Sequence, residues 1–336
     1  MSSKKEIKIS ALSFTSEDKN RIINEKIIFI DIAPKNNLLL LLSSHNTFYI
    51  CQISQKILTI KKKFENVIED PIKINKSYFC NEDPNIILLL SDNRNIYEWT
   101  IDREYISHIY YDVLGESYEF KMNCQKNVSN ENYIQNFCVF QENKIDVWNT
   151  MKYNKKNVMH IENVNCFSYD STGLLLYYIE KLIQKYYIRV IKFVDEYECN
   201  EIYYKTLLFQ DSKINIDYIN CFDINIIISD TKLGKVFIYK SYPIKEKEFE
   251  ISLNNTYSLY FPFVGLDPLF QFGILCFNIN NNSQTLINLC YKTMAKNIEN
   301  VDLTIPDLYY MKEIINGKGL LLGFNDITKE LIQYDI

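Results

Sequence analysis

The chain has 336 residues, of which 47% are hydrophobic and 14% aromatic, so it can bury a sizeable core. Its net charge of −5 gives no overall positive field for nucleic acid, and the short lysine runs at 61–63 and 152–156 are interpreted as solvated loops. The nine cysteines are an odd number and include no closely spaced pair, which favours a reducing compartment. The N-terminus lacks an apolar signal segment, and no apolar run is long enough to span a membrane. We therefore expect an intracellular protein of the cytoplasm or the nucleus.

The chain repeats one pattern seven times: a first strand, a wholly apolar run, a polar turn and an alternating segment. The run at 86–90 followed by 96–101 is the clearest copy, and the alternation of its second part is typical of a strand. A period of roughly 40 to 50 residues is what propellers and solenoids leave in a sequence. In chain order the predicted four-stranded units cover 27–61, 72–111, 118–161, 164–209, 216–253, 257–305 and 308–336, the last one together with 6–14.

One position in the alternating segment recurs in all seven units. Counting from Trp99, the equivalent residues are Cys51, Trp99, Trp148, Val190, Tyr239, Leu289 and Tyr334. Strand-forming residues dominate these segments, so the predicted unit is a small antiparallel sheet.

The last unit has room for three strands before the chain stops, while a strand-like segment at 6–14 precedes the first unit. The economical arrangement pairs the two segments, because a closed ring of sheets leaves only protected edges. The predicted fold is therefore all-β: a seven-bladed β-propeller of four-stranded antiparallel blades, formed as a single domain over 1–336 and closed by its N-terminal strand.

The residues that follow two of the apolar runs resemble the WD40-type β-propeller family. Ser91 and Asp92 before Trp99 are similar to the family's Ser-Asp turn and its strand ending on Trp, and Ser229 and Asp230 before Tyr239 match more loosely. The family's Gly-His dipeptide is missing, which leaves the fold resting on apolar packing. The resemblance implies a scaffold like the mitotic-checkpoint, mRNA-export or chromatin-complex propellers.

Catalytic and metal-binding patterns are not found in the sequence. His45, His108 and His160 stand alone, away from metal-ligand spacing, and there is no Gly-rich phosphate loop and no Gly-X-Ser-X-Gly motif. We expect no cofactor and no enzymatic activity. The alternative that stays open is a divergent hydrolase-type propeller with a site in its axial channel.

Aromatic residues crowd the sixth and seventh units. Core packing explains most of them, but exposed aromatic side chains are favoured at binding hot spots. The candidate partner-binding residues are Tyr257, Tyr260, Phe261, Tyr309 and Tyr310. The sequence thus predicts a non-catalytic adaptor that binds proteins or peptides, without direct nucleic-acid contact, as a monomer within a larger complex.

Overall fold

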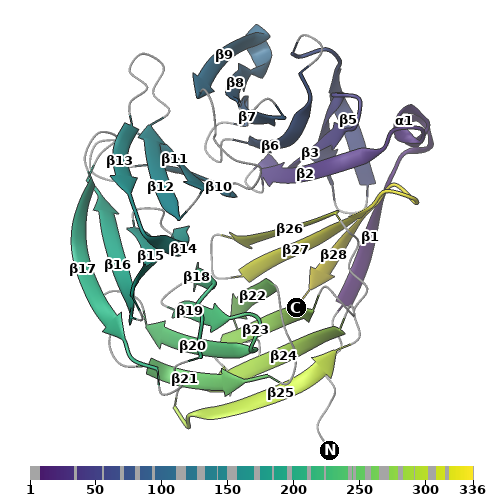
Figure 1. The fold of residues 1–336 in the computed structure, drawn as a ribbon. Coiled ribbons are helices and arrows are strands. Elements are labelled where there is room, and N and C mark those ends of the chain that lie inside the picture. The colour runs from purple at the N-terminus through teal and green to yellow at the C-terminus, as the bar shows by residue number, and fades with distance from the viewer. Residues whose placement is uncertain are drawn as a thin grey trace, which may run out of the picture. The chain divides into compact units, whose positions relative to one another are not determined.

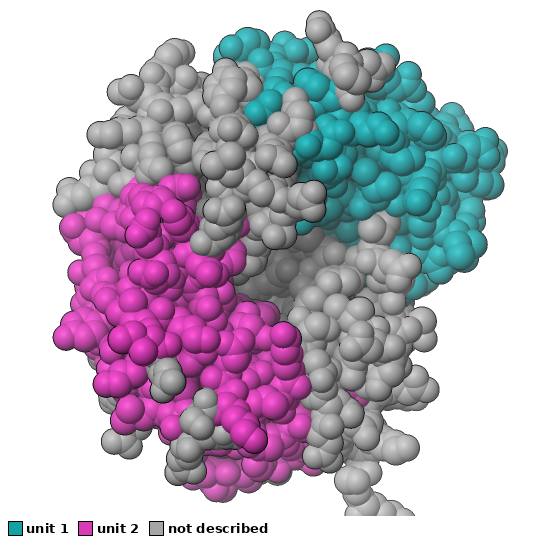
Figure 2. Space-filling model, viewed as in Figure 1, with its two compact units in different colours: residues 1–114, 305–314, 319–336 teal, residues 115–304, 315–318 magenta. Residues whose placement is uncertain are grey.

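The structure is a computed structural model, and it shows an almost wholly β chain (Figure 1). It describes residues 8–33, 36–54, 57–68, 72–79, 84–92, 95–110, 119–126, 133–141, 143–149, 157–169, 175–183, 185–194, 199–209, 213–222, 225–240, 244, 247–253, 259–264, 272–278, 283–290, 292–301, 308–314 and 318–335. The chain divides into two compact units (Figure 2), which are described separately below.

Unit 1 contains residues 1–114, 305–314 and 319–336, and its strands form three blades. Blade 1 is β2 (Ile27–Ala33), β3 (Leu38–Ser43), β4 (Phe48–Ile53) and β5 (Ile57–Phe64). Blade 2 is β6 (Ile74–Phe79), β7 (Ile86–Ser91), β8 (Ile96–Thr100) and β9 (Tyr105–Tyr110), with the short 3-10 helix η2 (Ile101–Arg103) before β9. Blade 7 is β26 (Leu308–Ile314), β27 (Lys318–Asn325), β28 (Glu330–Asp335) and β1 (Lys8–Phe14).

Unit 2 contains residues 115–304 and 315–318, and its strands form four blades, each a separate antiparallel sheet. Blade 3 is β10 (Glu119–Lys126), β11 (Tyr133–Gln141), β12 (Lys144–Asn149) and β13 (Asn157–Ile161). Blade 4 is β14 (Val164–Tyr169), β15 (Leu175–Leu182), β16 (Lys185–Phe193) and β17 (Cys199–Leu207). Blade 5 is β18 (Tyr218–Phe222), β19 (Asn225–Asp230), β20 (Lys235–Lys240) and β21 (Lys247–Ser252). Blade 6 is β22 (Leu259–Val264), β23 (Phe272–Asn278), β24 (Ser283–Cys290) and β25 (Ala295–Val301).

The apolar second strands are explained by burial on both faces. In β3, Leu39 and Leu41 pack in a cluster with residues of blade 7 and β1. Leu40 and Leu42, which point to the opposite face of the same strand, pack in a cluster with residues of blade 2. A strand covered on both faces reads as a continuous hydrophobic run and does not alternate. This packing is why the repeat was visible in the sequence.

The N-terminal strand β1 completes blade 7, as predicted. It pairs antiparallel with β28, with Ile9 opposite Tyr334 and Ser10 opposite Gln333, and the two strands lie side by side in Figure 1. The other edge of β1 makes a short parallel pairing with β5, where Ser13 faces Ile57. Blades 7 and 1 therefore share one eight-stranded sheet, which the sequence did not predict.

A helix between β1 and β2 was also absent from the prediction. It is α1 (Ser16–Ile22), and Thr15 caps it by accepting a hydrogen bond from the Asp18 backbone N–H. Asp18 is buried, and its Oδ2 accepts a hydrogen bond from the Ile60 backbone N–H at 3.0 Å. This hydrogen bond links α1 to β5, and it provides the partner that a buried carboxylate requires.

The predicted all-β class of four-stranded antiparallel blades is confirmed. One local interpretation was wrong: Lys61, Lys62 and Lys63 are exposed residues of β5 and do not lie in a loop. β5 is the fourth strand of its blade, where polar side chains can face water. The single-domain assignment stays a prediction.

Candidate interaction surface

The turn that joins the second and third strands of a blade, here called its tip turn, places one residue in the left-handed backbone region in several blades. In blades 1, 3 and 5 this residue is Asn46 (φ 58°), Asn143 (φ 63°) and Gly234 (φ 61°). Asn and Gly adopt this conformation at low cost. Blade 4 instead has Ile183 (φ 58°), and blade 7 has Lys329 (φ 57°). A β-branched residue is a genuine outlier in this region, so the backbone at Ile183 is strained.

Exposed aliphatic and basic side chains gather around the tip turns of blades 4 and 5. Ile183 is 97% exposed, Leu208 82%, Leu233 44% and Leu182 38%. The exposed lysines of the same segments are Lys181, Lys185, Lys213 and Lys232. We call these eight residues the tip surface of blades 4 and 5. Apolar groups rimmed by polar residues mark interaction sites more often than scattered exposed residues do.

A chain of hydrogen bonds joins the two halves of the tip surface. Lys181 Nζ donates to Asn215 Oδ1 at 2.9 Å, and Tyr186 OH donates to the same oxygen at 3.0 Å. The Asn215 backbone N–H donates to Asp230 Oδ2 at 2.7 Å. Asp230 Oδ1 in turn accepts from the Leu233 backbone N–H at 2.9 Å. The tip turns of the two blades are therefore held together through Asn215 and the buried Asp230.

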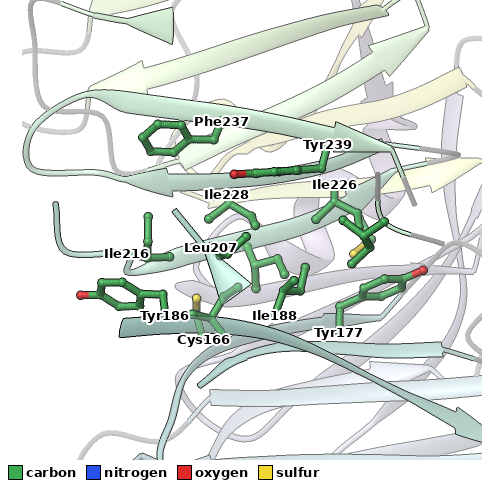
Figure 3. Packing of buried hydrophobic residues seen from close by; sticks show 14 of the residues in the cluster. Cys166, Tyr177, Tyr186, Ile188, Leu207, Ile216, Ile226, Ile228, Phe237 and Tyr239 are labelled. Carbon is green, nitrogen blue, oxygen red and sulfur yellow. The ribbon is translucent and has the colours of Figure 1, made fainter. Parts of the chain in front are cut away.

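Aromatic packing supports the surface from below. The Phe209 ring lies 6.0 Å from the Tyr186 ring and 4.7 Å from the Phe237 ring, between centroids. Tyr186 and Phe237 belong to the buried cluster between blades 4 and 5, and Figure 3 shows both at the same end of that cluster, beside Ile216. The exposed side chains thus stand on a packed core.

The charge of the tip surface is positive. Two carboxylates that neighbour it in the sequence accept hydrogen bonds within the fold: Asp230 as above, and Asp217, which accepts from the Thr231 backbone N–H at 2.9 Å and from Thr231 Oγ1 at 2.6 Å. Asp230 is 2% exposed, whereas all four lysines are exposed residues. The surface therefore presents cations and aliphatic groups to water.

A second charged group on blade 4 is internally satisfied. Arg189 donates through Nε to Glu180 at 2.6 Å and through Nη1 to both Glu201 oxygens at 3.0 and 2.9 Å. Burial lowers the pKa of Arg189, but the hydrogen bonds to the two glutamates outweigh it and the pKa is raised. Burial, with the charge of Glu201, raises the pKa of Tyr178. The ion pairs of Arg189 with Glu180 and Glu201 therefore stabilise this face of the sheet, and we do not assign them to a binding site.

The repeat positions predicted from the sequence all lie on third strands. They are Cys51 on β4, Trp99 on β8, Trp148 on β12, Val190 on β16, Tyr239 on β20, Leu289 on β24 and Tyr334 on β28. Trp99 is buried, and its ring contacts those of Phe48 and Phe64 at 5.3 and 4.8 Å between centroids. The side chain of Trp148 lies outside the described residues. Burial, with the charge of Glu250, raises the pKa of Tyr239 to about 12.

The two Ser-Asp pairs close tip turns. In blade 2, Ser91 Oγ accepts from the Asn95 backbone N–H at 3.2 Å, and Asp92 Oδ1 accepts from the Lys73 backbone N–H at 3.1 Å. In blade 5, Ser229 is buried and Asp230 makes the contacts described above. Each aspartate ties the tip turn to the segment that leads into the first strand of its own blade.

The predicted partner-binding aromatics are only partly described. Tyr260 and Phe261 lie on β22, and Tyr309 and Tyr310 lie on β26, but the positions of their side chains are outside the described residues, as is all of Tyr257. Their role stays a prediction.

The sequence analysis missed the aliphatic residues of the tip surface. The signal was present in Lys181, Leu182 and Ile183 and in Lys185, since apolar residues bracketed by lysines stand where a turn ordinarily takes Gly, Asn or Asp. Exposure itself cannot be read from the sequence, because the neighbouring apolar residues of β15 are buried.

The described residues contain no group of three or more His, Cys, Asp or Glu side chains arranged to hold a metal ion. His45 Nδ1 lies 3.2 Å from Glu25 Oε2, and His160 Nδ1 lies 2.7 Å from Asp146 Oδ1. The hydrogen bond to Asp146 raises the pKa of His160 against a smaller lowering by burial. Among the described helices, none has the length and apolar character needed to cross a membrane.

Comparisons with known proteins support the fold. No model of a protein family matches the sequence, and no curated protein matches it. Solved structures do match. A chain in the crystal structure of a mitotic checkpoint complex has a TM-score of 0.57 at 8% identity over 94% of this chain and 89% of that chain. A protein from Lactobacillus plantarum has a TM-score of 0.53 at 9% identity over 84% and 86%. The chain therefore has the β-propeller fold.

Proposed function

We propose that this β-propeller is a non-catalytic interaction scaffold, an adaptor subunit of an intracellular protein complex. The observation that carries the proposal is the tip surface of blades 4 and 5, where Ile183 is held in a strained backbone conformation with its side chain in water. Strain of this kind persists at functional sites because the surrounding structure compensates for it.

The comparison with a chain of a mitotic checkpoint complex adds a precedent for this fold within a protein assembly. We further propose that the chain is a WD40-like propeller on the basis of its two Ser-Asp tip turns. The proposed partners are proteins or peptide motifs, without direct nucleic-acid contact, and the proposed location is the cytoplasm or the nucleus. Within the complex we expect one copy of the chain.

Purification of the tagged full-length protein from its own cells, followed by gel filtration, tests this proposal. The expected result is a discrete complex in which another protein co-elutes in stoichiometric amount. Elution of the chain alone, at low and at moderate salt, would contradict the scaffold role. A stoichiometric metal ion in elemental analysis, lost together with structure on chelation, would favour the alternative enzyme.

A further inference from the structure

We propose that the tip surface of blades 4 and 5 binds an acidic amphipathic helix of a partner protein. This inference rests on the proposed scaffold function and names the chemistry of the partner. Three features of the surface support it. An aliphatic side chain is exposed on a strained backbone, the local charge is positive, and hydrogen bonds join the two tip turns before a partner binds.

The aliphatic side chains of the tip surface are exposed and therefore contribute little to the stability of the fold. Three other tip turns use Asn or Gly at the left-handed position, whereas blade 4 uses Ile183 at φ 58° and leaves its side chain 97% exposed. Neither the backbone conformation nor the exposure stabilises the isolated chain. Leu208 lies near it, since the preceding Leu207 pairs with Tyr186, close to the start of β16. A partner that buries both side chains would gain from their transfer out of water.

The charge of the surface selects an acidic partner. The surface carries four exposed lysines, Lys185 and Lys232 among them, whereas the neighbouring carboxylates Asp217 and Asp230 are two in number and accept hydrogen bonds within the fold. The whole chain carries a net charge of −5, so the positive charge is a local feature. Complementary charge steers association and suppresses partners of like charge.

The surface is also rigid before binding. The hydrogen-bonded path from Lys181 through Asn215 and Asp230 to Leu233 fixes both tip turns relative to each other. A preorganised surface loses little conformational entropy when a partner docks.

The spacing of the two tip turns suits a helix. Blades 4 and 5 pack face to face, as the buried cluster between them shows, and packed sheets lie about 10 Å apart. A helix rises about 1.5 Å per residue, so two aliphatic side chains seven residues apart on one face span about the same distance. A peptide would contact only the positive patch. An anionic bilayer would meet a wider surface of this acidic chain, so we favour the peptide.

A direct binding measurement tests the proposal with the full-length protein. The probe is a fluorescein-labelled helical peptide of about 20 residues, with Leu on one face and Glu on the other. Two comparison probes are the same peptide with Lys in place of Glu, and phosphatidylcholine vesicles containing phosphatidylserine. Binding is followed by anisotropy for the peptides and by sedimentation for the vesicles.

Ile183→Asn is the informative variant, because Asn suits the left-handed position and the protein should fold at least as well. We expect it to weaken binding of the Glu peptide about tenfold or more, as loss of a buried aliphatic contact requires. Lys185→Glu should weaken binding about tenfold, and Lys61→Glu, on β5, should leave it unchanged and serves as the matched control. Added salt should weaken binding of the Glu peptide by the wild type.

Selective binding of the Glu peptide that is lost in Ile183→Asn supports the proposal. Equal binding of both peptides, binding of vesicles alone, or binding of no probe overturns it. If stoichiometric partners of the native protein still co-purify with Ile183→Asn, the scaffold function stands and this surface is wrong. If no partner co-purifies with the wild type, the scaffold function itself fails.

Discussion

The tip turns of blades 4 and 7 occupy the same place in their blades but use it differently. In blade 7 the left-handed residue is Lys329, whose side chain is 4% exposed and donates to the Glu25 backbone carbonyl and to Asp326 Oδ1. Asp326 Oδ1 also accepts from the Ile27 backbone N–H at 3.0 Å. In blade 4 the left-handed residue is Ile183, and its side chain contacts water.

This difference indicates that the tip turn of blade 7 has a structural role, whereas the tip turn of blade 4 is a candidate binding site. The blade 7 turn joins the last blade to the first strand of blade 1, and each of its buried polar atoms named above has a partner. The backbone strain at Lys329 is thus offset within the fold. At Ile183 the side chain at the strained position is 97% exposed and contributes no buried contact, which is why we place the interaction surface there.

The largest expected effect comes from removing the N-terminal strand, which belongs to the same junction as Lys329. Deleting residues 1–14 exposes the edge of β28 from Glu330 to Asp335 and opens the apolar cluster that contains Leu12 and Phe14. Open strand edges pair between molecules. The truncated protein should melt at a lower temperature and aggregate, as measured by calorimetry and light scattering.

Unchanged melting and solubility after this deletion would show that β1 is dispensable and that the junction is misassigned. A cysteine pair sharpens the test, since Ser10 lies directly opposite Gln333. Cross-strand Cα atoms lie about 4.5 to 5.5 Å apart, within the range that a disulfide spans. Ser10→Cys with Gln333→Cys should form a disulfide on mild oxidation, and each single variant should not.

Replacing the buried lysine tests whether the blade 7 turn is structural. Lys329→Met keeps much of the side-chain volume but leaves the Glu25 carbonyl and Asp326 without this donor. We expect the free energy of unfolding to fall by about 1 to 3 kcal/mol. Chemical denaturation measures it, and a variant as stable as the wild type would remove the contrast between the two turns.

The opposite result is expected at blade 4. Ile183→Asn should raise the free energy of unfolding by about 1 kcal/mol, because Asn tolerates the left-handed backbone better than a β-branched residue. The matched control is Ile327→Asn in the blade 7 turn, since Ile327 is 93% exposed and is not among the residues with positive φ. This control should leave stability within about 0.5 kcal/mol. Equal effects of the two substitutions would argue against strain at Ile183.

The smallest expected effect is the pH dependence of stability that comes from Glu25, near the start of blade 1. Burial raises the pKa of Glu25, but hydrogen bonds from His45 and Ser43 outweigh it, so the folded-state pKa lies below the unfolded value. Ionised Glu25 therefore contributes stability above the unfolded pKa of about 4.3, and this contribution is lost as the pH falls through the folded pKa. Glu25→Gln should destabilise the protein by less than about 1 kcal/mol at neutral pH. Denaturation of both proteins at several pH values should show the difference narrowing in acid; a constant difference would contradict the assignment.

The sequence was sufficient to predict the strands of the blades, but not the α1 helix or the exposed residues of the candidate interaction surface. Second strands such as β3 and β19 are buried on both faces, so their apolar runs mark each blade in the sequence. The α1 helix was missed although Thr15 and Asp18 carry a capping signal, because seven residues show too little periodicity. The lysines that bracket Leu182 and Ile183 in the sequence hint at a turn, but the exposure of Ile183 depends on the tertiary packing of blade 4 and could not be predicted.

The central claim is that partners dock on the tip surface of blades 4 and 5. Amine cross-linking of the native complex, read by mass spectrometry, tests it most directly, because the chain carries exposed lysines both there and on β5. Partner cross-links should concentrate at Lys185, Lys213 and Lys232 and should be lost in Ile183→Asn. Partner cross-links at Lys61 and Lys62, with none at the tip surface, or a pattern unchanged by Ile183→Asn, would contradict the claim.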